Sequence, residues 1–123
     1  MNGNMQPSDK ELKDAKDKLE KAKEQLQKAE SCWDNDTFIE ALKKKTPKEK
    51  EKAVDLKLDI GTKLLLIENA QIALVAGRIK ENSQQLKSAV TDLGDALQTI
   101  SNVTKILNAI GSLLSIVSKI LAL

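Results

Sequence analysis

Few residues of this chain belong to the types that carry out chemistry in proteins. Histidine, the commonest general base and the commonest metal ligand, is absent. The one cysteine, Cys32, has no histidine to activate it as a nucleophile and no second cysteine for an internal disulfide. We therefore interpret Cys32 as a small buried hydrophobic residue of a protein from a reducing compartment.

Carboxylates and short motifs provide no stronger candidate. Asp92 and Asp95 are the only acids after Glu81, and because no third ligand accompanies them, we favour a solvent-facing turn over a metal pair. The sequence contains no phosphate-binding loop, dinucleotide-binding glycine pattern, zinc-protease motif or nucleophile elbow. We assign no catalytic, cofactor-binding or metal-ligating residue, and we predict that the chain is not an enzyme.

The charge balance argues against a nucleic-acid partner. Lys and Arg number 20 against 18 Asp and Glu, a formal net charge of +2, so there is little bulk attraction for a polyanion. The lysine-rich residues 43–52 include no arginine, no aromatic residue and two glutamates, so we interpret them as a solvated corner, with attraction to anionic lipid headgroups as the alternative. Because no apolar signal-peptide core lies near the N-terminus, we expect a cytoplasmic protein, with signal-independent secretion as the alternative.

The elements that would position any site are helices. Leu, Ala, Lys, Glu and Gln dominate, while Trp33 and Phe38 are the only aromatic residues, so we predict an all-α fold. We expect an elongated three-helix bundle, or a four-helix bundle, with coiled-coil-like packing. Residues 1–7 are predicted to be a flexible lead and residues 8–123 a single helical domain, with helices at about residues 8–33, 37–45, 47–81 and 83–122.

Capping residues mark where several of these helices begin. Ser8 and Glu11 have the spacing of a capping box, and Thr46 followed by Pro47 is a second strong start signal. Asp36 is expected to cap the short helix. Gly94 and Gly111 are the positions at which we expect the last helix to bend or end.

Hydrophobic periodicity indicates which helices cover the core and which form it. The first helix has a narrow seam of apolar residues at spacings of three and four. Because residues 64–76 are polar only at Glu68, Asn69 and Gln71, we expect helix 47–81 to be the buried central helix, with Asn69 and Gln71 setting its register. Trp33 and Phe38 are expected to close one end of the bundle. The seam of the first helix consists of Leu12, Ala15, Leu19, Ala22, Leu26, Ala29 and Trp33.

Residues 100–123 combine a broad apolar face with very little charge. Lys105 and Lys119 are their only charged residues, and the apolar face covers roughly 200° of the helix, about twice the stripe of a surface helix. The narrow first helix cannot cover all of this face. We predict that it is the interaction surface, formed by Val103, Ile106, Leu107, Ile110, Leu113, Leu114, Val117, Ile120 and Leu121.

Two classes of function remain. The first is an assembly protein that packs its apolar heptad faces against a second copy of itself or against a helical protein partner. The second is membrane binding through residues 100–123, which are cationic, free of acids and rich in Ile, Leu and Ser. In layout the chain resembles the helical pore-forming toxins, which hide an apolar segment inside a helical bundle and release it later. That resemblance implies a membrane-active protein.

Overall fold

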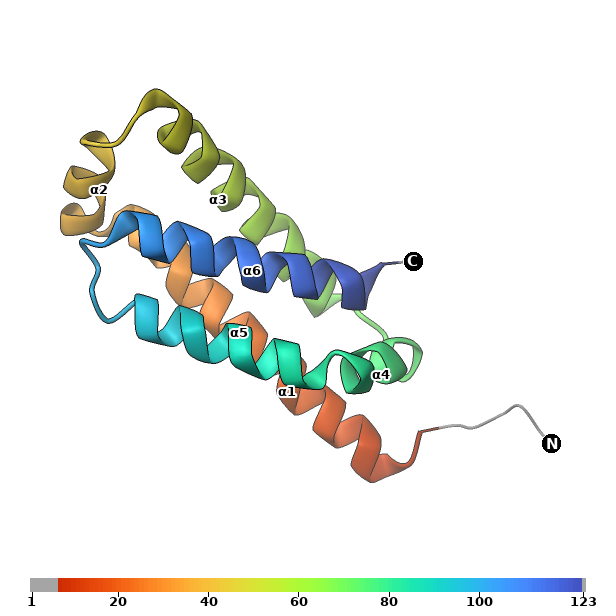
Figure 1. Ribbon diagram of the computed structural model, residues 1–123. Helices are drawn as coiled ribbons and strands as arrows, with labels where there is room; N and C mark the ends of the chain where they lie inside the picture. The colour runs from red at the N-terminus through yellow and green to blue at the C-terminus, as the bar shows by residue number, and fades with distance from the viewer. Residues whose placement is uncertain (1–6, 123) are drawn as a thin grey trace.

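The computed structural model describes residues 7–122, which are all-helical and contain no strand. Most of the predicted flexible lead, residues 1–6, lies outside the described part, as does Leu123. These residues form six α-helices and one short 3-10 helix. Figure 1 shows how the α-helices are arranged. The elements are α1 (Asp9–Glu30), η1 (Ser31–Asp34), α2 (Asp36–Lys43), α3 (Pro47–Glu68), α4 (Ile72–Glu81), α5 (Ser83–Ala96) and α6 (Val103–Leu121).

The centre of the fold is α6, which contacts each of the other five α-helices and lies between α3 and α5 in Figure 1. The expectation that helix 47–81 is central was wrong. A broad apolar face can be covered by several neighbours at once, and α6 has the broadest one. Its fully buried residues are Val103, Ile106, Leu107, Ile110, Leu113, Leu114, Val117 and Ile120.

The seam of α1 is confirmed. Its middle positions, where alanine alternates with leucine, are all buried, and α1 packs against α3, α4, α5 and α6. The small alanine side chains let these neighbours approach closely, while the other faces of the helix remain charged. The buried residues are Ala15, Leu19, Ala22, Leu26 and Ala29.

The α3 helix is amphipathic in an unusual way, because it has two separate apolar faces. Ala53, Ile60 and Ile67 recur every seven residues and are buried against α1 and α6. Other large apolar residues of the same helix face away from the molecule and are exposed. The wide apolar distribution in the sequence therefore reflects one buried face and one exposed face.

Two predicted helices are each interrupted in the structure. The helix expected at residues 47–81 stops at Glu68, where Asn69 Nδ2 donates a hydrogen bond to the Leu65 carbonyl at 2.9 Å and Gln71 is extended. Asn69 and Gln71 are exposed, so they end a helix and do not set the register of a core. Asn side chains that bond to the backbone in this way compete with helix continuation.

The helix expected at residues 83–122 is interrupted at residues 97–102. Neither Gly94 nor Gly111 causes the break, since both lie inside helices. The connection has Thr, Ser and Asn residues, which favour turns. It ends where Asn102 caps α6 by accepting a hydrogen bond from the Lys105 backbone N–H at 3.2 Å.

The remaining cap signals behave as predicted with one exception. Ser8 and Glu11 form the capping box of α1, and Thr46 caps α3 with Pro47 in its first turn. For α2 the cap is Asn35 in place of Asp36, because the Asn35 side chain accepts the Phe38 backbone N–H at 3.2 Å.

Candidate interaction surface

The outer face of α3 carries the largest exposed apolar side chains that lie together on one element. Val54, Leu58 and Leu65 are 56%, 67% and 60% exposed. Their spacings of four and seven residues align them along one side of the helix. We call this row the α3 stripe. Apolar side chains that are exposed in a row are typical of a surface that another molecule covers.

A groove of about 720 Å³ runs beside the α3 stripe. Glu30, the last residue of α1, and Trp33, from η1, form one wall, while Gly61 and Thr62 join the stripe in lining the other. Trp33 is held in place by Phe38, since their ring centroids lie 5.1 Å apart with an interplanar angle of 59° and Phe38 is fully buried. The two aromatic residues thus close one end of the core, and Trp33 also borders the groove.

Gly61 leaves a notch in the middle of the groove. A Cβ atom at this position would meet only the Glu30 Oε2 atom, at 4.0 Å. The backbone of α3 is therefore accessible there, between Leu58 and Leu65. A large side chain of a docked molecule fits over such a position.

Charged residues border the stripe on the same side of α3 as Gly61. Lys57 and Glu30 both line the groove, and no ion pair joins either of them to another residue of the described chain. Farther along the helix, Lys50 and Glu68 are both exposed, near opposite ends of α3. Unpaired charges of both signs at the border of an apolar stripe are available to a docked molecule.

The structure places the predicted interaction surface inside the core. The eight residues from Val103 to Ile120 are between 0% and 3% exposed, and Leu121 is partly buried. In this arrangement they pack against α1–α5 and are not free to contact a partner. An interaction through them requires α6 to leave its place, and it stays a prediction.

By length and composition α6 is able to cross a membrane, and it is the one helix of residues 7–122 that meets this criterion. The core helix of a soluble protein meets the same criterion when its apolar face is buried. Lys105 and Lys119 remain exposed on its outer side, as does Asn108, whose Oδ1 accepts a hydrogen bond from Lys52 Nζ at 3.2 Å.

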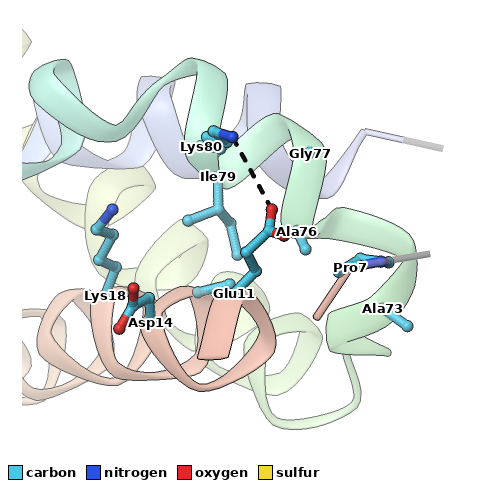
Figure 2. A pocket seen from close by; sticks show the side chains of 10 residues that line it. Pro7, Glu11, Asp14, Lys18, Ala73, Ala76, Gly77, Ile79 and Lys80 are labelled. Carbon is cyan, nitrogen blue, oxygen red and sulfur yellow. Dashed lines mark ion pairs between the residues drawn. The ribbon is translucent and has the colours of Figure 1, made fainter. Parts of the chain in front are cut away.

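A second hollow, of about 460 Å³, lies between the start of α1 and α4 (Figure 2). Glu11 pairs across it with Lys80, with 3.9 Å between the Oε2 and Nζ atoms. The Ser8 backbone N–H and hydroxyl, and then the Lys80 charge, lower the pKa of the Glu11 carboxyl. Asp14 and Lys18 contribute one more charge of each sign, so this hollow offers no net charge to a ligand.

Chemically reactive groups are sparse in the described residues. Cys32 is buried, and burial raises the pKa of its thiol to about 11, which suppresses the nucleophilic thiolate. Asp92 and Asp95 are exposed on α5. Residues 7–122 contain no group of three or more His, Cys, Asp or Glu side chains placed to hold a metal ion.

Sequence reasoning missed the α3 stripe because its residues were counted as part of one broadly apolar helix. The signal was present in the spacing. Ala53, Ile60 and Ile67 share one side of the helical wheel, whereas Val54 and Leu65 lie well over 100° away from it. Two separated apolar faces predict two separate contacts.

Comparisons with known proteins leave the function to be argued from this geometry. The chain matches no protein-family model, no curated protein and no solved structure.

Proposed function

We propose that this protein is a non-enzymatic interaction module that docks a helix of another polypeptide on the α3 stripe. The observation that carries the proposal is the exposure of Val54, Leu58 and Leu65 in one row beside a groove walled by Trp33. Aromatic residues at the edge of an apolar groove are typical anchors of protein interfaces.

A helix is the occupant that fits this surface best. The stripe is straight, has helical spacing and is notched at Gly61, which suits side chains arriving every three to four residues. Such a pairing would supply the coiled-coil-like packing that the heptad pattern predicts, between two chains. Burying a wholly exposed large apolar side chain contributes roughly 1.5–3 kcal/mol. Because Val54, Leu58 and Leu65 are 56–67% exposed, covering them contributes about half of that for each.

Site-specific cross-linking tests this function. A photoreactive amino acid replaces Leu58 in the full chain, and the matched control carries it at Leu74, which is 70% exposed on α4 and away from the groove. After illumination in the cells that produce the protein, we expect a protein adduct from position 58, identified by mass spectrometry, and none from position 74. Equal labelling at both positions, or none at either, contradicts the proposal.

Membrane binding through residues 100–123 is the second candidate, and the length and apolar composition of α6 favour it. It requires α6 to leave the core and expose its buried face to lipid. Flotation with anionic liposomes tests it, comparing the full chain with a Lys105→Glu, Lys119→Glu variant that keeps the core intact. Flotation of the wild type, reduced in the variant, supports this candidate, while absence of flotation removes it.

A further inference from the structure

We infer that the occupant of the α3 stripe is a second copy of this chain, whose own α3 lies antiparallel to the first across a two-fold axis. The inference rests on the proposed function and names its partner. It follows from two kinds of complementarity that α3 has with itself, one of shape and one of charge.

The shape of the stripe is self-complementary in the antiparallel orientation. Leu58 is the most exposed side chain of the stripe, and Gly61, three residues away, is its notch. When the two-fold axis passes between them, Leu58 of each copy lies over Gly61 of the other. The same axis places Val54 opposite Leu65 of the second copy, so each contact of the stripe occurs twice, as an isologous interface demands.

The charged residues that border the stripe are arranged around the same two-fold axis. Lys50 and Glu68 lie on the Gly61 side of the helix, and the midpoint between them falls within one residue of the midpoint between Leu58 and Gly61. Antiparallel pairing therefore places Lys50 opposite Glu68 of the second copy, and Glu68 opposite its Lys50. A parallel pair would place the two copies of each charged residue on opposite sides of the interface, so neither Lys50 nor Glu68 would meet an opposite charge.

The groove provides a second pair of opposite charges. Glu30 lies beside Gly61 in its own chain, with its Oε2 atom 4.0 Å from where a glycine Cβ would be. In the antiparallel arrangement Lys57 of the second copy passes next to this position. Since neither residue has an ion-pair partner within the described chain, the contact gives each of them one. Antiparallel helix dipoles also favour this orientation.

Sedimentation velocity over a concentration series tests whether the second copy binds. We expect the full chain to change from monomer to dimer as its concentration rises. Leu58→Lys should weaken the dimer about 100-fold or more, because it places a charge in the centre of the stripe. Leu74→Lys is the matched control, since Leu74 is equally exposed but lies on α4, and it should leave the dimer unchanged.

A glycine substitution separates dimer contacts from folding. Gly61→Ala meets no close neighbour in its own chain, so it should raise the melting temperature of the monomer through better helix propensity. The same methyl group obstructs Leu58 of the second copy and should weaken the dimer roughly tenfold. Gly77→Ala, at an open position on α4, should stabilise the monomer and leave the dimer unchanged.

A charge exchange tests the antiparallel register. Lys50→Glu and Glu68→Lys should each weaken the homodimer, because like charges then face one another. An equimolar mixture of the two variants should form a heterodimer as tight as the wild type, because every facing pair is again opposite in sign. Failure of the mixture to recover would overturn the register.

The outcomes also separate this inference from the proposed function. A chain that stays monomeric at every concentration, or a dimer that withstands Leu58→Lys, overturns the second copy as occupant. Cross-linking from position 58 to a different protein would at the same time retain the α3 stripe as a docking surface.

Discussion

Among residues 7–122, Gln25 is the one residue with a buried side-chain oxygen or nitrogen atom that has no hydrogen-bond partner. Its Oε1 atom is buried and unpaired within residues 7–122. The side chain lies over Gly94, where a Cβ atom would be at an ordinary van der Waals distance of 3.6 Å from the Gln25 Nε2 atom. The Gln25 side chain thus lies between α1 and α5, in contact distance of position 94.

We expect Gln25→Met to stabilise the protein. The substitution keeps the length of the side chain and removes a buried acceptor, whose desolvation costs about 1–3 kcal/mol. The free energy of unfolding in urea should rise by about 1 kcal/mol. Gln27→Met, at an exposed position of α1, should change it by less than about 0.5 kcal/mol. A loss of stability in Gln25→Met would contradict the unpaired state of Oε1.

The buried thiol of Cys32 predicts a stability change in alkali. Burial raises its pKa from 9.0 to about 11, so the folded state holds the neutral thiol while the unfolded chain ionises earlier. The contribution to stability is therefore complete below pH 9 and is lost as the pH rises toward 11. Relative to Cys32→Ala, wild-type stability should decline between these values in urea titrations. A constant difference across that range would contradict a buried neutral thiol.

At the scale of elements, the sole arginine of the chain joins the end of α6 to α4. The Arg78 Nε atom donates a hydrogen bond to the Ile120 carbonyl at 2.7 Å. The last carbonyls of a helix have no hydrogen-bond partner within it and carry the negative end of its dipole. A guanidinium supplies both a donor for such a carbonyl and a positive charge beside the dipole. Arg78 is in this way the C-terminal cap of the central helix.

Removal of this cap should loosen α6 at its end. We expect Arg78→Met to lower the free energy of unfolding by about 1.5–3 kcal/mol, because the hydrogen bond is charge-assisted. Hydrogen exchange should accelerate in the last turn of α6. Lys80→Met, which removes a charge from the exposed side of the same helix, is the control and should change both quantities little. Equal losses of stability in Arg78→Met and Lys80→Met would contradict a capping role for Arg78, because both variants remove one positive charge.

Local signals predicted the elements better than they predicted how the elements pack. Capping residues such as Ser8 and Thr46 identified helix starts because their hydrogen bonds lie within a few residues of sequence. The break at Asn69 depends on where the chain must turn, which periodicity does not report. The choice of which face of α3 meets the core depends on α1 and α6, so the exposure of Leu58 followed only from the three-dimensional arrangement.

At the scale of the whole molecule, α6 holds the other helices together. It contacts all five other α-helices, so a chain that ends at Asn102 takes from α3 and α5 their most extensive packing partner and from α1, α2 and α4 one partner each. We expect such a chain to lose most of its helical circular dichroism and its cooperative thermal transition. A full-length chain with Lys119→Glu, an exposed position on α6, should keep both. Cooperative unfolding of the shortened chain would contradict the central role of α6.

The position of α6 at the core has a consequence for folding during synthesis on the ribosome. A ribosome produces α1–α5 before α6, so α1 can already contact α3, α4 and α5, while the faces of α3 and α5 that pack on α6 remain uncovered. At about 5–20 residues per second, these faces stay uncovered for a few seconds before α6 is synthesised, and exposed apolar surface of this kind is prone to aggregation and is bound by chaperones. Completion of the core therefore waits for the synthesis of α6, the last of the six α-helices in chain order.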